Sequence, residues 1–179
     1  AIKNYRKQNT EVKRLVIHFY KTMSNRELEP IKKELQEMGL DIPVIIITIN
    51  KTESKDLVLF DLNCPELIPV SGTFISIGRN QFLLCNNTRY ENTLPKSTEG
   101  FPFPIKLSMS ASENKLLEDD KLIKDLIDQV YQFSRMYWKS VRQQNLPVTI
   151  KYPEMVAEIF PHFESNTMPE FGKNNLWFL

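Results

Sequence analysis

Two apolar runs stand out in the first 50 residues of the chain. Residues 15–20 and 42–49 are rich in β-branched and aromatic side chains. This composition favours strands, and near-continuous apolarity is typical of central strands that are buried on both faces. We therefore predict two strands, and we expect the first to be a central one. Pro43 is tolerated because it lies at the start of its run.

A helix is predicted between these strands. Ser24 and Glu27 have the spacing of a capping box, and Gly39 is a natural helix stop. The apolar stripe between them consists of Leu28, Ile31, Leu35 and Met38. Because proline fits best in the first turn, Pro30 predicts that the helix begins a few residues after Ser24. Strand, helix and strand form a βαβ unit, so the two strands are expected to be parallel.

From residue 57 onward the pattern changes to short apolar runs separated by turns. Strands are predicted at residues 57–60, 73–77, 82–85 and 104–109. Gly78, Arg79 and Asn80 are typical of a hairpin turn between two of them. Residues 86–101 are polar and predict a long surface loop, of the kind that is often functional.

Two helices are predicted in the last third of the chain. The first, residues 116–144, carries acids in its first turns and bases in its last turns, as the helix dipole favours. Its core stripe consists of Leu122, Leu126, Val130, Phe133, Tyr137 and Val141. The second helix, residues 153–160, has Pro153 in its first turn and stops at Pro161. Strands and helices together predict one α/β domain over residues 1–179.

The charges nearly cancel, with 23 Lys and Arg against 22 Asp and Glu, but they are sorted into zones. Residues 1–24 and 135–151 are basic, and the acids collect around residues 113–128. A sorted surface can present a basic groove to nucleic acid. An unevenly charged, solvated surface explains the same pattern equally well.

Cysteine content and hydropathy exclude several classes of protein. Cys64 and Cys85 are too few and too far apart for a disulfide framework or a CxxC metal site, and they are interpreted as buried thiols of a reduced, cytoplasmic protein. No apolar run reaches the roughly 18 residues of a membrane span, and the N-terminus lacks a signal-peptide core. The chain begins without Met, which indicates a fragment of a longer polypeptide.

No catalytic motif is present, neither a phosphate-binding glycine loop nor a nucleophile elbow nor a metal-spaced Cys/His cluster. His18 is interpreted as a hydrogen-bonded core or edge residue. Residues 135–160 interleave cationic and amide side chains with aromatic ones between the two predicted helices. This junction suits phosphate contacts, although an ordinary solvated helix end explains it equally well. The apolar residues 176–179 predict a docked C-terminus with a fixed carboxylate, or simple packing of Trp177 and Phe178.

Three segments in this order resemble the C-terminal part of the PIWI domain of Argonaute proteins, most closely the bacterial members. They read "RLVIHFYKTMSNRELEPIKKEL", "GTFISIGRNQFLLCNNTRYENTLPKS" and "VYQFSRMYWKSVRQQNLPVTIKYPEMVAEIF", the last followed by "LWFL". The resemblance covers nearly the whole chain. It implies an RNase H-like fold, in which a mixed β-sheet flanked by helices binds a guide strand paired to a target.

Active members of that family hold two divalent metal ions with three acids and a fourth residue, for phosphodiester hydrolysis. The first acids would precede Ala1. A later acid lies in an Arg-Asp-Gly triplet, which here reads Lys21, Thr22 and Met23. The fourth residue, usually His or Asp, falls at Glu154. A threonine hydroxyl is a weak ligand for a hard cation, and a site that offsets roughly +4 loses one negative charge. The resemblance therefore implies binding without cutting.

Contacts with the guide strand also follow from the resemblance. The matching residues are Lys51, Asn87, Arg89, Lys139, Arg142, Asn145 and Lys151. In the family the C-terminal carboxylate, here that of Leu179, reaches the pocket for the guide 5′ end, in many members through a metal ion. Mg²⁺ is therefore the cofactor expected there.

Three function classes stay open. The leading one is a catalytically silent PIWI domain in prokaryotic defence against foreign DNA, which holds guide RNA or DNA with a complementary target strand and switches on an associated effector protein. The second is an active, metal-dependent endonuclease of the same fold that uses upstream acids and Glu154. The third is an α/β interaction domain whose basic zones are merely solvated.

Overall fold

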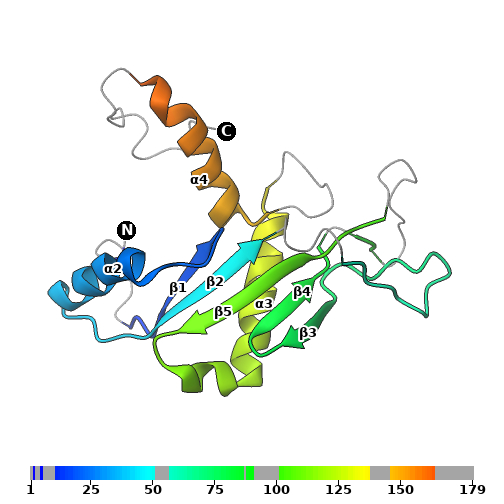
Figure 1. Cartoon of the computed structure of the whole chain (residues 1–179), viewed down its shortest axis with the longest axis horizontal. Helices are drawn as coiled ribbons and strands as arrows, with labels where there is room; N and C mark the ends of the chain where they lie inside the picture. The colour runs from blue at the N-terminus through cyan, green and yellow to red at the C-terminus, as the bar shows by residue number, and fades with distance from the viewer. Residues whose placement is uncertain are drawn as a thin grey trace.

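The computed structural model describes residues 2, 5, 11–50, 57–86, 88–90, 101–137 and 146–163. Five strands form one sheet in the order β1-β2-β5-β4-β3 (Figure 1). The strands are β1 (Leu15–Phe19), β2 (Val44–Asn50), β3 (Phe74–Gly78), β4 (Gln81–Leu84) and β5 (Ile105–Ala111). The helices are α2 (Asn25–Glu37), α3 (Asp120–Arg135) and α4 (Val148–Ile159), with short 3₁₀ turns η2 (Asn114–Glu118) and η3 (Phe160–His162).

The βαβ unit is confirmed, because β1 and β2 are parallel with Leu15 opposite Val44. The expected central position of β1 is wrong: within the described residues β1 pairs only with β2 and lies at the edge of the sheet. Its continuous apolarity has another cause. Leu15, Ile17 and Phe19 pack toward α2, whereas Val16 packs into the core on the other face of the sheet.

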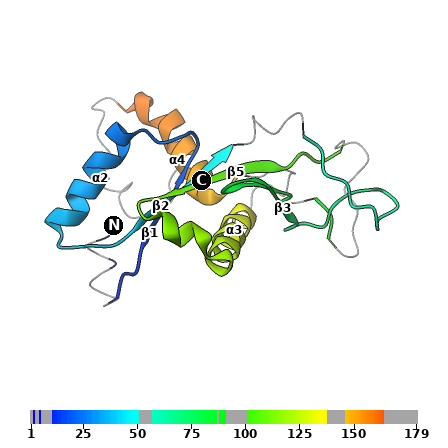
Figure 2. The same cartoon turned by 60° about the horizontal axis from the view of Figure 1, so that its bottom comes forward.

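The sheet is covered on both faces, by α3 on one and by α2 on the other (Figure 2). The alternation of side chains along β2 explains this arrangement. Ile45, Ile47 and Ile49 join the core under α3, whereas Val44 and Ile46 face α2. Each fully buried side chain of this size stabilises the fold by about 1.5 to 3 kcal/mol, so β2 anchors both layers.

Helix α2 begins directly at Asn25, so the prediction of a later start is wrong. The Glu27 carboxylate accepts hydrogen bonds from the backbone and hydroxyl of Ser24 and fixes this start. Pro30 is exposed in the helix interior, where water can bind the carbonyl group that lacks its intrahelical donor. The predicted stop is confirmed: Gly39 has a φ of 65°, a conformation that favours glycine.

Helices α3 and α4 also differ from their predicted bounds. A 3₁₀ turn precedes α3, which begins at Asp120 because Asp119 caps it by accepting from the backbone of Lys121 and Leu122. It ends at Arg135 instead of continuing toward residue 144, and residues 138–145 lie outside the described ranges. Helix α4 begins at Val148, five residues before the predicted start, with the exposed Pro153 in its interior.

The hairpin is confirmed: β3 and β4 are antiparallel, and Asn80 adopts a φ of 57° in the turn between them. The predicted strand at residues 57–60 is wrong, because these residues pair with no strand in the described part of the chain. The backbone beside it closes on itself instead, with Asp61 N–H donating to the Leu67 carbonyl at 2.9 Å. Cys64 and Cys85 are buried free thiols, as predicted, and burial raises the pKa of Cys85 to about 12.

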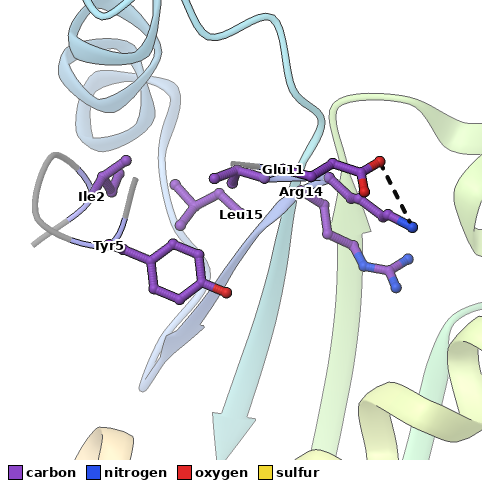
Figure 3. A pocket seen from close by; sticks show the side chains of 7 residues that line it. Ile2, Tyr5, Glu11, Arg14 and Leu15 are labelled. Carbon is purple, nitrogen blue, oxygen red and sulfur yellow. Dashed lines mark ion pairs between the residues drawn. The ribbon is translucent and has the colours of Figure 1, made fainter. Parts of the chain in front are cut away.

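A pocket of about 620 Å³ opens beside the start of β1 (Figure 3). Ile2, Tyr5 and Leu15 give it a mainly apolar lining. Its charged lining residues are Glu11, Lys13 and Arg14. Glu11 and Lys13 form an exposed ion pair at 3.9 Å, which contributes little to stability. The pocket lies at the amino end of β1, away from the carboxyl ends of the strands where ligands of α/β sheets usually bind.

His18 joins β1 to α4. Its Nδ1 atom lies 2.7 Å from Oγ1 of Thr149, and its ring meets Phe133 of α3 edge-on, with centroids 5.9 Å apart. Burial lowers the pKa of His18 to about 4, so the imidazole is neutral near pH 7. The prediction of a hydrogen-bonded core or edge residue is confirmed.

The folded protein is expected to lose stability as the pH falls from about 6.5 to about 4. His18 resists protonation in the folded state, whereas the same ring in the unfolded chain takes up a proton near its ordinary pKa, so acid favours unfolding. The shift corresponds to a loss on the order of 2 to 3 kcal/mol in the free energy of unfolding. Urea unfolding of the intact protein across this pH range measures it.

Two substitutions isolate the contribution of His18. His18→Gln keeps a hydrogen-bonding group for Thr149 but does not titrate, so the pH dependence of stability should shrink. His162→Gln removes the other histidine of the chain from an exposed position in η3 and is the matched control. An equal reduction in both variants would contradict the role given to His18.

Candidate functional site

One edge of the sheet collects the ends of several elements. Strands β1 and β2 are parallel, and β4 runs in the same direction because β2 and β4 are both antiparallel to β5. The carboxyl ends of β1, β2 and β4 therefore meet at one edge. The end of α3 and the start of α4 lie there as well (Figure 1). We call it the upper edge, after its place in Figure 1, and it is where an open α/β sheet usually binds its ligand.

Thr22 lies at the upper edge, directly after β1, and is exposed. Beside it, Nζ of Lys21 lies 3.0 Å from Oε1 of Glu27. The other carboxylate oxygen, Oε2, accepts hydrogen bonds from the backbone N–H and the hydroxyl of Ser24, both at 2.8 Å. The carboxylate of Glu27 is thus held by one ammonium group and two further donors.

These bonds fix the charges at the end of β1. The hydrogen bonds from the Ser24 backbone and then from Lys21 lower the pKa of Glu27 to about 2. The same contact with Glu27 raises the pKa of Lys21. Because the pair is exposed, it sets local geometry more than stability. A carboxylate whose oxygens already serve these donors is poorly placed to bind a divalent ion.

Helix α4 carries a second ion pair in its first two turns. Nζ of Lys151 lies 2.7 Å from Oε2 of Glu154, and this hydrogen bond raises the pKa of Lys151. The helix begins after Pro147, and Thr149 in its first turn ties it to His18 of β1. Glu154, the candidate fourth metal ligand, therefore has an ammonium group as its immediate neighbour.

Within the described residues, no three His, Cys, Asp or Glu side chains lie close enough together to hold a metal ion. Thr22 offers only a hydroxyl group, and Glu27 and Glu154 are each paired with a lysine. This part of the upper edge does not fit a two-metal centre of the kind that hydrolyses phosphodiesters.

None of the helices described here is both long and apolar enough to span a membrane.

Comparison with protein families shows to which family this chain belongs. The model of the Piwi domain matches residues 1–163. The chain belongs to the Piwi domain family. A protein of Archaeoglobus fulgidus named "Piwi protein" is 26% identical over 173 residues, an alignment that covers 89% of this chain and 39% of the relative. The chain thus spans about two fifths of that protein.

The fold of this Piwi domain agrees with a solved Argonaute structure, a crystal structure of Aa-Ago with externally bound siRNA. The two superpose with a TM-score of 0.50 at 15% identity, over 91% of this chain and 20% of the other. The predicted fold class, an RNase H-like mixed sheet flanked by helices, is confirmed. The likeness to this structure, at 15% identity, concerns the fold.

Four of the residues that the sequence assigned to function lie in the described part of this Piwi domain: Thr22, Arg89, Lys151 and Glu154. The fold brings them to the upper edge from three elements that are distant in sequence, since they follow β1, follow β4 or lie on α4. The remaining residues lie outside the described ranges and their roles stay predictions. They are Lys51, Asn87, Lys139, Arg142, Asn145 and Leu179.

Arg89 is engaged by the domain itself. Its Nε donates to the carbonyl oxygen of Ile68 and its Nη2 to Oδ2 of Asp61, both at 2.9 Å. The Arg89 and Asp61 side chains are only 17% and 24% exposed. Thr88 adds a hydrogen bond to the Pro69 carbonyl at 2.7 Å. Arg89 thus fastens residues 61–72 to the segment after β4, an internal role that the sequence did not reveal, while its guide contact stays a prediction.

Sequence reasoning missed two further contacts at the upper edge. Glu27 was assigned to helix capping alone, although it also binds Lys21. Arg135, at the end of α3, contacts the rings of Tyr90 and Tyr131. Arg135 and Tyr90 are far apart in the chain, so no local pattern connects them. Their proximity follows from the direction of β4. This strand runs toward the upper edge, so Tyr90, which follows it in the chain, lies near the end of α3.

Arg89→Ala is expected to lower the free energy of unfolding by roughly 1 to 3 kcal/mol, because it removes the cation that balances the partly buried charge of Asp61. Asp61→Ala should cost a similar amount, and the double variant should cost little more than either. Urea unfolding of the three variants measures the coupling. Lys13→Ala, which breaks an exposed pair, is the control and should change little. Additive costs for Arg89→Ala and Asp61→Ala would contradict a shared role.

Proposed function

We propose that this Piwi domain holds a guide strand, RNA or DNA, paired with a complementary target strand, and does not cut the target. The proposal rests mainly on the residues that follow β1. Where active members of the family carry a metal-binding aspartate, this chain has Thr22, and the carboxylate of Glu27, which pairs with the neighbouring Lys21, also accepts hydrogen bonds from Ser24. The residues that remain support contacts to phosphates better than metal-assisted hydrolysis.

Cations at the upper edge support the binding of a strand. Lys21, Arg135 and Lys151 come from three elements that meet there, and two further bases, Lys139 and Arg142, follow within seven residues of the end of α3 in the sequence. Phosphate contacts from lysine and arginine do not depend on base sequence, and they supply most of the affinity for a backbone. The solved relative, Aa-Ago, is described with an siRNA bound externally, which agrees with a nucleic-acid partner here.

Three finer points belong to the same proposal. The carboxylate of Leu179 binds the guide 5′ phosphate, with Mg²⁺ between the two groups. The domain acts in cytoplasmic defence of a prokaryotic cell against foreign DNA. Recognition of a target switches on an associated effector protein, since a domain that binds without cutting needs a partner to produce an outcome.

The intact protein is expected to leave a complementary target uncut when it is loaded with guide and supplied with Mg²⁺ or Mn²⁺. The physical reason is the neutral Thr22 in place of an acid that helps to balance roughly +4 of metal charge. Denaturing gels of end-labelled target, with the target supplied once as RNA and once as DNA, give the measurement. Target bound but intact supports the proposal; specific cleavage opposite the guide overturns it, and Glu154→Gln then shows whether Glu154 belongs to the metal site.

Lys139→Ala combined with Arg142→Ala is expected to weaken binding of all guide sequences alike. The loss of two phosphate contacts should reduce the slope of log affinity against log salt by about 1.4 to 1.8. Fluorescence anisotropy with unrelated guide sequences at several salt concentrations measures both effects. Lys32→Ala with Lys33→Ala removes the same charge from α2, where each lysine pairs with a glutamate, and serves as the control. An unchanged slope in the first variant would count against these contacts.

A further inference from the structure

The side chains of Tyr90, Tyr131 and Arg135 form a stack at the upper edge. Cζ of Arg135 lies 5.3 Å from the centroid of the Tyr90 ring and 5.6 Å from that of the Tyr131 ring. Its Nη1 also donates to the Tyr131 hydroxyl at 3.5 Å. Both centroid distances fall within the range of cation–π attraction, so the rings restrict the position of the guanidinium.

Both tyrosines are held by well-packed elements. Tyr131 lies on α3 with its ring directly against Gly72, where a Cβ atom would be 3.4 Å from two ring carbons. Gly72 is itself tied to the sheet, since its N–H donates to the Cys85 carbonyl at 2.7 Å. Tyr90 follows Arg89, which is fixed by Asp61 and Ile68. The stack is therefore a preorganised feature of the fold.

Among the residues that the structure describes, no carboxylate balances the charge of Arg135. Lys21, Arg89 and Lys151 each pair with an acid, whereas no Asp or Glu in the described ranges forms an ion pair with Arg135. A guanidinium has five N–H donors, and the described residues give it one hydrogen bond, to Tyr131. Arg135 is exposed at the edge where the strands end, so the remaining donors are available to an anion from solvent.

We propose that Arg135 binds a backbone phosphate of the nucleic acid and that Tyr90 and Tyr131 position it. The proposal rests on the proposed function and adds a contact to it. A planar guanidinium matches two phosphate oxygens at once. Because the tyrosines already restrict the side chain, less conformational entropy is lost on binding than for a free arginine. The contact is independent of base sequence, because its partner is the phosphate.

Arg135→Gln tests the contact in the intact protein, with a fluorescent oligonucleotide as the probe and anisotropy measured at several salt concentrations. Affinity should fall by about tenfold, and the slope of log affinity against log salt should fall by about 0.7 to 0.9, the value of one phosphate contact. Lys121→Gln removes the same charge at the other end of α3 and is the matched control. It should leave both quantities unchanged. An equal effect of the two substitutions overturns the proposal.

Tyr90→Leu separates positioning from charge. It keeps Arg135 and removes one ring, so affinity should fall several-fold while the salt slope stays as in the unmodified protein. Arg135→Lys should keep the slope but lose affinity, because an ammonium group is not a planar fork. If Tyr90→Leu weakens binding while Arg135→Gln leaves the slope intact, Tyr90 stacks on a base and the phosphate contact is overturned.

The proposed function and the Arg135 contact can be disproved separately. Absence of nucleic-acid binding by the unmodified protein overturns the proposed function itself. Salt-dependent binding by the unmodified protein, with Arg135→Gln indistinguishable from Lys121→Gln, leaves the proposed function intact and removes only Arg135 from the interface. Urea unfolding of each variant confirms that the comparison is made between folded proteins, and Arg135→Lys provides a conservative substitution if Arg135→Gln does not fold.

Discussion

Burial of β2 on both faces is the constraint on which the rest of the structure depends. Its alternating side chains enter two apolar layers, one with α3 and one with α2, and its two edges pair in parallel with β1 and antiparallel with β5. A shift by one residue would exchange the two faces and bury Thr48 in place of Ile47. The directions in which β2 and β5 pair with their neighbours fix which strand ends meet at the upper edge, and the register fixes which face of the sheet each side chain enters.

Local chemistry in the sequence predicted most of the elements but not all of their ends. The βαβ unit, the hairpin at Asn80 and the stop at Gly39 follow from short-range rules, and the structure confirms them. Both proline-based predictions of a helix start were wrong for one reason. Pro30 and Pro153 are exposed, so solvent compensates the missing hydrogen bond and the helix can begin earlier. Apolarity likewise could not distinguish an edge strand packed on two faces from a central one.

The sequence predicted candidate site residues only where a single residue by itself indicates a function. Thr22 and Glu154 came from a resemblance, and the fold places both near the edge where β1 ends and α4 begins. Their charged neighbours depend on tertiary contacts. Nothing local shows that Glu27 binds Lys21, that Asp61 binds Arg89, or that Tyr90 meets Arg135. The sequence thus identified candidate residues, and the structure shows which of them already form contacts within the domain.

The ion pairs at the upper edge have a consequence for selectivity. Lys21 and Lys151 already form ion pairs with Glu27 and Glu154. An incoming anion must therefore displace a carboxylate of the same chain. A single free phosphate gains little from such an exchange. A strand presents phosphates at regular spacing on one backbone, and several exchanges then share a single cost of association. On the proposed function, the internal glutamates Glu27 and Glu154 would therefore favour polymers with many phosphates over small anions.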